Sequence, residues 1–329
     1  MRVTVLGAGS WGTTVAALVA RRHDTVLWSR DPEHAASIQK TRENARYLPG
    51  TSLPDDLRAT SDLAEAAGHA QVLIVGIPTS GFRETIEAAA PFVAPWIPVI
   101  SLSKGFEQGT RLRMTELIQE VLPGRPAAAL TGPNIAREIM GGSAAASVLA
   151  TPDLDVATEL QHLLQRGVFR IYTNTDVLGC ELGGALKNVV AIASGIAQGL
   201  FVGDNTRAAV MTRGLAELTR LGVAMGANPA TFYGLAGMGD LMVTCMSPHS
   251  RNRHVGEQLG LGIPIDEILG DMTMVAEGVK TASTVHEMAA EYDIAMPVCE
   301  SVYQVVAGEI TAPEAYTGLR QAGQEAQPG

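Results

Sequence analysis

A glycine-rich turn at the beginning of the chain constrains its fold more than any other feature. An apolar, β-branched run at residues 3–6 leads into Gly7-Ala-Gly9-Ser-Trp-Gly12, a G-x-G-x-x-G pattern, and small residues follow at once. A strand, this turn and a helix in that order are typical of a dinucleotide-binding turn. Gly7 permits the tight turn, Gly9 lets the backbone approach a diphosphate, and Gly12 allows close packing of helix and strand. The alternative is an ordinary glycine-rich connection between a strand and a helix.

Strand-like and helix-like stretches alternate through the first half of the chain. Strands are expected at residues 3–6, 25–28, 72–77, 98–102, 127–131, 144–150 and 168–172. Amphipathic stretches between them predict helices at residues 32–40, 61–67, 81–90 and 111–121. This alternation predicts an α/β fold with a mainly parallel, doubly wound sheet and helices on both faces. Ligands of such sheets bind at the carboxyl ends of the strands.

Helical patterns dominate after about residue 176. They lie at residues 178–199, 206–225, 229–234, 250–259, 265–269, 276–292 and 297–307. A length of 329 residues also exceeds what one hydrophobic core usually supports. We therefore predict a Rossmann-type nucleotide-binding domain over residues 1–180, an all-α substrate-binding domain over 181–317 and a flexible tail over 318–329. The active site is expected between the two domains.

Composition argues against several classes of function. The net charge of -10 disfavours a nucleic-acid-binding surface and gives no general attraction to anionic lipid. The longest apolar stretch, residues 189–202, contains Ser194 and Gln198 and falls short of a membrane span. The three cysteines show no metal-ligand spacing, and the first strand leaves no room for a secretion signal. We expect a cytoplasmic protein without metal or stable membrane insertion, and both monomer and homodimer stay open.

The end of the second predicted strand bears on the choice of nucleotide. Ser29 stands where an NAD-dependent enzyme often carries an acidic residue for the ribose 2′-hydroxyl, and Arg30 follows. Serine with arginine accommodates a 2′-phosphate, which favours NADP(H) while leaving NAD(H) acceptable. Alternatively, Arg30 is a surface residue that stacks on the adenine of either nucleotide. Asp31 is expected to cap the next helix.

Two polar turns follow later strands. Lys104, in Ser-Lys-Gly after the strand at 98–102, is expected to point into the cleft that receives the nicotinamide. A solvated loop lysine is the alternative. The turn Thr-Gly132-Pro-Asn134 opens a helix whose free N–H groups can hold an anion or a polar substrate group. Taken alone, Gly-Pro is a common turn signal.

A lone lysine marks the long apolar helix that starts the second half. Lys187 is the only charged side chain between Leu182 and Gly203, and the residues at helical spacing around it are mostly small. A lysine buried on such a strip needs an anion or a polar substrate, and the strip leaves room for a ligand to approach. We therefore predict that Lys187 transfers a proton. The alternative is a lysine that reaches the surface. Asn188 is expected to orient a carbonyl or the lysine.

The segment 237–253 carries the last cluster. Ser250 is a favourable N-cap, and Arg251, Asn252 and Arg253 occupy the first helical turn. Cations normally avoid the positive end of a helix dipole, so two arginines there indicate that an anion such as phosphate is bound. Asp240 is expected to position a substrate hydroxyl or to hold Lys187. The alternative is a polar loop between helices.

These motifs together resemble the bacterial-type NAD(P)-dependent sn-glycerol-3-phosphate dehydrogenases across nearly the whole chain. The block 237–253 is the most specific, because related dehydrogenases share the glycine-rich turn but lack this block. The resemblance implies reversible NAD(P)H-dependent reduction of dihydroxyacetone phosphate, with Lys187 as proton acceptor and a role in glycerophospholipid synthesis. It implies cofactor contacts at Ser10, Trp11, Arg30, Lys104, Ala136, Arg251, Val275 and Glu277. It implies substrate contacts at Lys104, Gly132, Asn134, Asp240, Ser250, Arg251 and Asn252.

Two other functions fit parts of the sequence. One is a two-domain dehydrogenase that acts on a hydroxy acid or an acyl-CoA, although the arginines near Ser250 favour a compact dianion. The other is a catalytically silent NAD(P)-binding sensor, which would not need Lys187. Activity on dihydroxyacetone phosphate excludes the sensor, and a panel of 3-keto and 2-keto substrates separates the two kinds of dehydrogenase.

Overall fold

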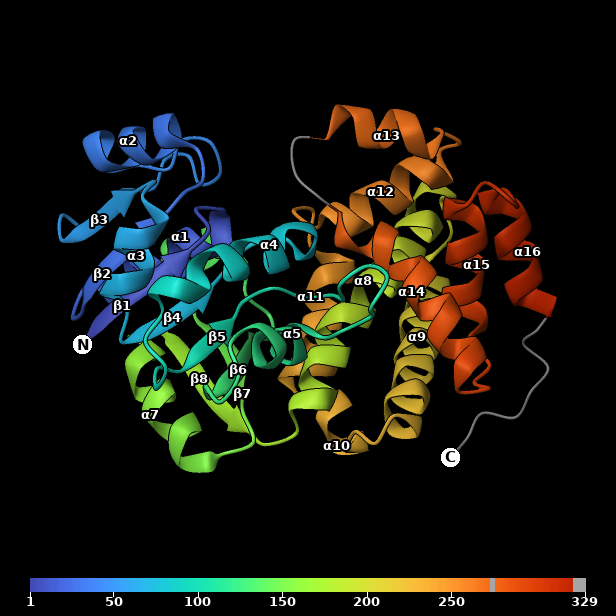
Figure 1. Ribbon diagram of the computed structural model, residues 1–329. Coiled ribbons are helices and arrows are strands. Elements are labelled where there is room, and N and C mark those ends of the chain that lie inside the picture. The colour runs from blue at the N-terminus through green and yellow to red at the C-terminus, as the bar shows by residue number, and fades with distance from the viewer. Residues whose placement is uncertain (273–275, 322–329) are drawn as a thin grey trace. The chain divides into compact units, whose positions relative to one another are not determined.

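One mostly parallel sheet organises the first half of the chain. The computed structural model describes residues 1–272 and 276–321, and within them eight strands run in the order β3-β2-β1-β4-β5-β6-β7-β8 (Figure 1). Every neighbouring pair is parallel except β6 and β7. The strands are β1 (Arg2–Leu6), β2 (Asp24–Trp28), β3 (Leu57–Thr60), β4 (Val72–Val75), β5 (Val99–Ser101), β6 (Ala127–Thr131), β7 (Ala145–Ala150) and β8 (Phe169–Asn174).

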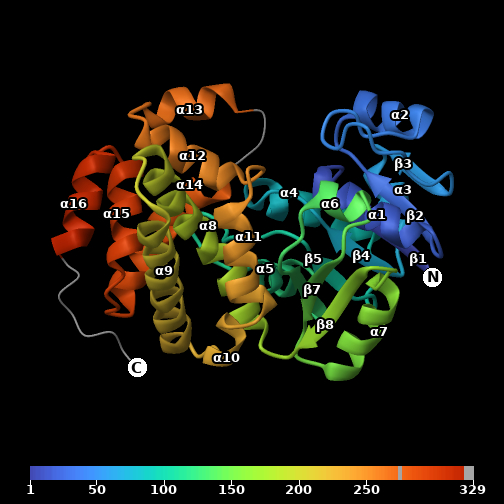
Figure 2. The ribbon, with the colours of Figure 1, turned by 180° about the vertical axis from the view of Figure 1, so that it is seen from behind.

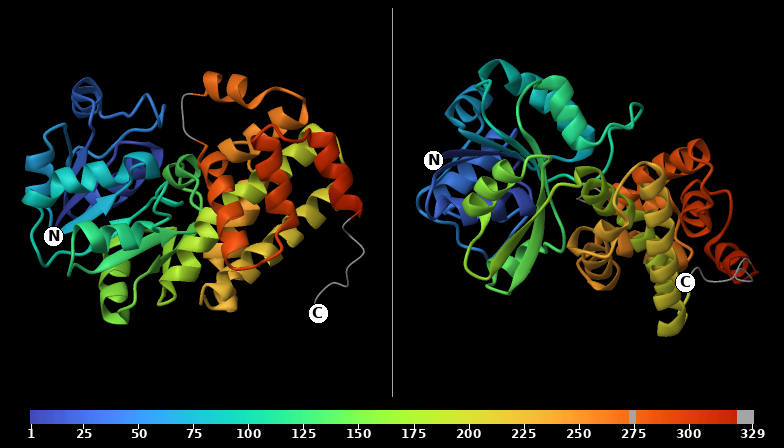
Figure 3. Two further views of the ribbon diagram at one scale, coloured as in Figure 1. Left: turned by 45° about the vertical axis from the view of Figure 1, so that its right-hand side comes forward. Right: turned by 90° about the horizontal axis from the view of Figure 1, so that it is seen from below.

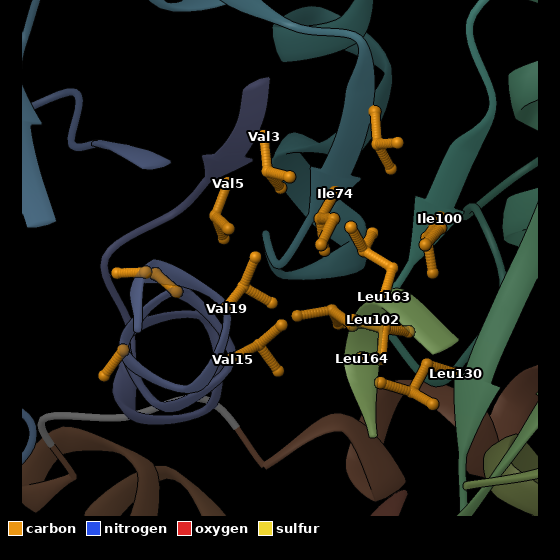
Figure 4. Close-up of a cluster of buried hydrophobic side chains, with 14 of the residues drawn as sticks. Val3, Val5, Val15, Val19, Ile74, Ile100, Leu102, Leu130, Leu163 and Leu164 are labelled. Carbon is orange, nitrogen blue, oxygen red and sulfur yellow. The ribbon is translucent and has the colours of Figure 1, made fainter. Parts of the chain in front are cut away.

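Helices cover both faces of this sheet. The bounds are α1 (Ser10–Ala20), α2 (Pro32–Thr41), α3 (Leu63–His69), α4 (Thr79–Ala89), η1 (Ala90–Phe92), α5 (Met114–Val121), α6 (Ala136–Met140) and α7 (Leu154–Leu164). Buried side chains of α1, α6 and α7 pack on one face, and those of α3, α4 and α5 on the other. Figure 4 shows part of the first core, where Val15 and Val19 of α1 meet strand residues such as Val5 and Ile74. The predicted doubly wound α/β fold is confirmed.

Strand β3 and helix α7 are among the elements of this half that the sequence analysis missed. Strand β3 is a short edge strand in which only Leu57 is buried, so its sequence lacks the apolar run that marks a central strand. Helix α7 was also not predicted, although Asp153 caps it by accepting hydrogen bonds from the N–H groups of Asp155 and Val156.

The second half is helical in the part that the structure describes. Its elements are α8 (Val177–Gly199), α9 (Asp204–Ala224), α10 (Pro229–Phe232), the π-helical turn η2 (Leu235–Gly239), α11 (Asp240–Met246), α12 (Arg251–Gly260), α13 (Ile265–Asp271), α14 (Glu277–Glu291), α15 (Pro297–Val306) and α16 (Ala312–Gln321). Figure 2 shows α8, α9, α11, α12 and α14 packed together, and Figure 3 shows these yellow-to-red helices from two more sides. The expected tail begins at Gly318, whereas α16 continues to residue 321.

The chain divides into two compact units, Met1–Glu181 and Leu182–Gly329, so the division falls inside α8. Among the described residues, α8 is the helix whose length and composition would allow it to cross a membrane. The apolar stretch that passes this test is 89% buried within the protein. A core helix passes the same test, and we interpret α8 as a core helix.

Candidate active site

The glycine-rich turn has the geometry that its sequence predicts. Gly7 has a φ of 111°, and a Cβ there would collide with the carbonyl oxygen of Gly76. A Cβ at Gly12 would collide with the carbonyl oxygen of Gly7. Around Gly9, no other atom lies within 4 Å of the Cβ position. The protein's own packing therefore requires Gly7 and Gly12, whereas the backbone at Gly9 is open to a ligand such as a diphosphate.

The first turn of α1 carries the next two candidates. Ser10 is its first residue, so it lies at the end where a helix presents free N–H groups. The Trp11 ring meets Phe169 edge to face, with the ring centroids 5.9 Å apart. Its Nε1 atom is buried and has no hydrogen-bond partner among the residues described. A buried donor without an acceptor is costly, and an oxygen of a bound nucleotide would satisfy it.

At the end of β2, Ser29 is buried and Arg30 is exposed. Asp31 caps α2 as predicted, because its Oδ1 accepts hydrogen bonds from the N–H groups of Glu33 at 3.1 Å and His34 at 3.2 Å. These bonds, that of His34 first, and the nearby Arg46 guanidinium lower the pKa of Asp31. Arg46 lies 3.2 Å from the Asp31 carboxylate. Arg46 is therefore a second cation, besides Arg30, near the end of β2. The sequence analysis missed it because Arg46 is 15 residues from Asp31 and only the fold brings the two together.

Lys104 joins two motifs that are distant in the sequence. Its Nζ donates hydrogen bonds to the carbonyl oxygen of Gly132 at 3.0 Å and to Oδ1 of Asn134 at 3.2 Å. Gly132 has a φ of 120°, and a Cβ there would lie 3.1 Å from the Cα of Ser147. The Nδ2 atom of Asn134 is buried without a partner in the described part of the chain. Ala136 is buried at the start of α6.

Lys187 is buried and paired. Its side chain is 7% exposed, and its Nζ lies 3.0 Å from Oδ1 of Asp240, which is equally buried. The ammonium also donates a hydrogen bond to Oγ1 of Thr244, and Thr244 donates to the Asp240 carbonyl oxygen at 2.6 Å. The prediction that Asp240 holds Lys187 is confirmed, and a lysine that reaches the surface is excluded. The sequence analysis gave Thr244 no role, although it lies four residues after Asp240.

Three of the residues at helical spacing around Lys187, namely Gly183, Val190 and Ser194, are covered by neighbouring helices. A Cβ at Gly183 would lie 2.7 Å from the carbonyl oxygen of Ala236 in η2. Val190 fills the space beside Gly214 of α9, and Ser194 donates to the Cys245 carbonyl oxygen of α11 at 3.5 Å. These contacts account for Gly183, Val190 and Ser194, and the expected approach of a ligand beside the other small residues stays a prediction.

The residues of the predicted anion site have different surroundings at the start of α12. Ser250 caps the helix as expected, accepting a hydrogen bond from the N–H of Arg253 at 3.2 Å. The Arg253 side chain turns away to the Ser247 carbonyl oxygen and to Glu257. Arg251, by contrast, is exposed in the first turn. The alternative interpretation, a polar loop between helices over 237–253, does not fit most of this segment, since η2, α11 and the start of α12 occupy it.

Asn188 and Asn252 pair with each other. Nδ2 of Asn252 donates to Oδ1 of Asn188 at 2.9 Å, and Oδ1 of Asn252 accepts from the N–H of Gly278 at 2.9 Å. Asn188 thus holds α12, and Asn252 ties α12 to α14. Glu277 begins α14, next to Gly278. Val275 lies outside the described residues.

Comparisons with known proteins agree with these motifs. Models of the N-terminal and C-terminal parts of NAD-dependent glycerol-3-phosphate dehydrogenase match residues 2–157 and 176–317. The chain is 56% identical to "Glycerol-3-phosphate dehydrogenase [NAD(P)+] 2" of Sphingopyxis alaskensis, covering 100% of this chain and 99% of the relative. It is 54% identical to the Mycobacterium avium protein of the same activity, covering 97% and 94%.

A solved structure extends this similarity to three dimensions. The crystal structure of glycerol-3-phosphate dehydrogenase from Coxiella burnetii superposes with a TM-score of 0.93 at 34% identity, covering 97% of this chain and 98% of that one. The two family models together span most of the chain, from the glycine-rich turn to α16. The chain therefore belongs to the NAD-dependent glycerol-3-phosphate dehydrogenase family.

Proposed function

We propose that this protein catalyses the reversible reduction of dihydroxyacetone phosphate to sn-glycerol 3-phosphate with NADPH, and less readily with NADH. The observation that carries the proposal is the buried ammonium of Lys187, held by Asp240 and Thr244. A buried, fixed proton donor suits the reduction of a carbonyl group. Relatives named for NAD(P)+ support the use of either nucleotide.

Residues of the first unit are proposed to bind the nucleotide. The open backbone at Gly9 and the unpaired Trp11 Nε1 both fit a diphosphate-containing ligand, and Gly7 and Gly12 shape the turn. We assign the remaining contacts to Ser10, Arg30, Lys104 and Ala136, and in the second unit to Arg251, Val275 and Glu277. The bound nicotinamide would supply the hydride for the substrate carbonyl carbon.

Several polar residues are proposed to bind the substrate. An exposed arginine beside the first N–H groups of α12 suits a phosphate dianion, which we assign to Arg251 with Ser250 and Asn252. Asn134 offers its Nδ2 hydrogens to a substrate oxygen, because Lys104 occupies its Oδ1. Lys104 and Gly132 complete the set, and Asp240 acts through Lys187.

Lys187 is proposed to handle the proton. An ammonium group has three hydrogens, and those of Lys187 include one directed at Asp240 and one at Thr244. We assign the third to the substrate oxygen at C2. In reduction, C2 would gain the hydride in a new C–H bond while this N–H bond breaks and the O–H bond forms, so the carbonyl becomes a secondary alcohol and Lys187 becomes neutral. In oxidation, neutral Lys187 takes the proton back.

The decisive experiment follows NADPH and NADH oxidation by absorbance with dihydroxyacetone phosphate as substrate. A panel of 2-keto acids and 3-ketoacyl thioesters serves as the control for the other dehydrogenase classes. We expect turnover with the phosphorylated ketone alone. Equal or faster turnover of a keto acid would contradict the substrate assignment, and nucleotide binding without turnover of any substrate would indicate a sensor.

Three wider features belong to this proposal. The product would feed glycerophospholipid synthesis, and the protein would work in the cytoplasm. We further propose a homodimer, because Met238, Met242 and Met246 are exposed at four-residue spacing along η2 and α11. Exposed apolar side chains grouped in this way commonly mark an interface. Light scattering after size-exclusion chromatography measures the oligomeric state directly.

A further inference from the structure

A chain of hydrogen bonds connects the end of β2 to the glycine-rich turn. The N–H of Asp31 donates to Oγ of Ser29 at 3.4 Å, and Ser29 Oγ lies 3.3 Å from Nδ1 of His34. Nε2 of His34 lies 3.0 Å from Oδ1 of Asn44. Nδ2 of Asn44 donates to the Ala8 carbonyl oxygen and to Thr13 Oγ1, both at 2.8 Å. Asn44 is fully buried and Ser29 is 6% exposed.

Backbone groups fix the orientation of the Asn44 amide and, through it, the direction of the bond between Asn44 and His34. The N–H of Tyr47 donates to Oδ1 of Asn44 at 3.1 Å, and the Ala8 carbonyl oxygen can only accept. The Asn44 amide therefore cannot be turned around, and its Oδ1 faces His34. Nε2 of His34 must carry a hydrogen, so Nδ1 is an acceptor in the neutral ring and a donor only in the imidazolium.

The protonation state of His34 therefore decides whether the Ser29 hydroxyl can donate a hydrogen bond to a ligand or only accept one. Beside the neutral ring, Ser29 gives its hydroxyl hydrogen to Nδ1 and presents a lone pair, which suits the 2′-hydroxyl of NAD(H). Beside the imidazolium, Ser29 accepts from Nδ1 and can turn its hydrogen toward an anion. The added positive charge acts in the same direction. Both effects favour the 2′-phosphate of NADP(H).

We propose that His34 is a specificity-determining residue, which sets the preference between NADP(H) and NAD(H) through Ser29. The inference rests on the proposed binding of both nucleotides at the glycine-rich turn. Several titratable or charged groups lie near His34 in the chain or contact its neighbours. Asp31 is the N-cap of α2 and Glu33 precedes His34 on that helix, the Tyr47 ring lies edge to face with the His34 ring at 5.4 Å, and Arg46 pairs with Asp31. Arg30 lies at the end of β2.

The test measures binding, by fluorescence titration of NADPH and NADH at about pH 8, 7 and 6, a range in which histidines commonly gain a proton. The matched variant is His34→Gln, whose side-chain amide can still donate to Asn44 but does not titrate. As the pH falls, the preference of the unaltered protein for NADPH should rise about two- to tenfold more than that of the variant, the range one hydrogen bond produces. The 2′-phosphate also gains a proton near pH 6, but it does so alike in both proteins.

A second variant and a measurement without substitution complete the test. Ser29→Ala should reduce the change with pH in the preference for NADPH, because it removes the hydroxyl that responds to His34 and leaves only the effect of the added charge. In histidine-labelled protein studied by NMR, the His34 ring, assigned through its contact with Tyr47, should gain its proton at a higher pH with NADPH bound than with NADH. The inference would be overturned if the preference for NADPH changed in parallel with pH in the unaltered protein and in His34→Gln, or if the ring titrated identically with both nucleotides. Either result would leave the proposed function untouched. Absence of binding by either nucleotide would overturn the proposed function together with the inference.

Discussion

Lys187 shows at the scale of single residues why a buried charge needs fixed partners. Its ammonium is in contact with the Asp240 carboxylate and the Thr244 hydroxyl, all within the second unit. Removing one member of a buried ion pair leaves the other uncompensated, which is strongly unfavourable. The two partners therefore hold Nζ in one place, and the third hydrogen is the one proposed to reach the substrate. This arrangement makes the lysine itself the sharpest target for substitution.

Lys187→Met should abolish turnover while leaving NADPH binding nearly unchanged. Methionine fills a similar volume but carries no proton, and general acid–base catalysis contributes about 10²- to 10⁴-fold to rates. Steady-state rates and a fluorescence titration of NADPH measure the two effects. Lys280→Met, which alters an exposed lysine of α14, is the matched control and should keep normal activity. Activity of Lys187→Met within a few-fold of the unaltered protein would remove Lys187 from the mechanism.

Arg251→Ala should raise KM for dihydroxyacetone phosphate and lower kcat/KM about 10- to 10²-fold, as expected for a lost charge-assisted hydrogen bond. Phosphate binding also orients the reacting carbonyl, so kcat should fall as well. Unphosphorylated dihydroxyacetone should be a poor substrate for the unaltered protein and lose much less in the variant. NADPH affinity is measured in parallel, since Arg251 is also proposed to contact the nucleotide. Equal losses for both ketones would show that Arg251 does not bind the phosphate.

At the scale of elements, glycines let α8 and α12 approach each other more closely than other residues would allow. A Cβ at Gly195 of α8 would collide with the Arg253 carbonyl oxygen, and one at Gly256 of α12 would collide with that of Ile192. Gly199 and Gly260 extend the same contact along both helices. The backbone contact positions α12, and with it Arg251, relative to the helix that carries Lys187.

Gly195→Ala should therefore destabilise the protein by about 3 kcal/mol, because the obstructing atom is backbone and cannot move aside cheaply. The matched control is Gly270→Ala in α13, where no atom lies within 4 Å of the Cβ position and the residue is exposed. Alanine there should stabilise by about 0.5–1 kcal/mol. Chemical denaturation measures both. A Gly195→Ala protein as stable as the unaltered one would show that the two helices can separate freely.

At the scale of the whole molecule, the two compact units carry different residues of the proposed site. The glycine-rich turn and Lys104 belong to the first, and Lys187 and Arg251 belong to the second. Each unit is also stabilised by buried polar contacts over long sequence distances. In the second, the buried Glu217 of α9 accepts hydrogen bonds from the N–H groups of Val298 at 2.9 Å and Cys299 at 3.1 Å, so it caps α15. Burial raises the pKa of Glu217 despite these bonds.

This raised pKa predicts how stability depends on pH. A carboxyl group whose pKa is higher in the folded state contributes stability at low pH and loses it as the pH rises through the folded pKa. The glutamine in Glu217→Gln does not titrate. The unfolding free energy that this variant loses relative to the unaltered protein should therefore shrink between about pH 4.5 and pH 7.5. Denaturation across this range measures the slope, with the exposed Glu267→Gln as control, whose cost should stay constant. A cost that grows with pH would contradict this prediction. It would mean that the N-terminus of α15 stabilises the ionised Glu217 carboxylate by more than burial destabilises it.

The local sequence was sufficient for features that depend on neighbouring residues. Gly7, Gly9 and Gly12 predicted a turn whose shape the backbone angles confirm, because steric limits on φ act within a few residues. The caps at Asp31 and Ser250 were predicted for the same reason, since a cap bonds to N–H groups two or three residues away. Alternating patterns likewise predicted most strands and helices.

Tertiary structure decided the contacts between distant residues. Thr244 as a partner of Lys187, Arg46 beside Asp31, and Asn44 beneath the glycine-rich turn could not be predicted, since their partners are far away in the sequence. The small residues around Lys187 have the same pattern whether a ligand or a helix covers them. Only the packing of η2, α9 and α11 against α8 shows that helices cover Gly183, Val190 and Ser194. Local sequence therefore determined backbone shape and helix ends, whereas burial and pairing of side chains depended on the folded chain.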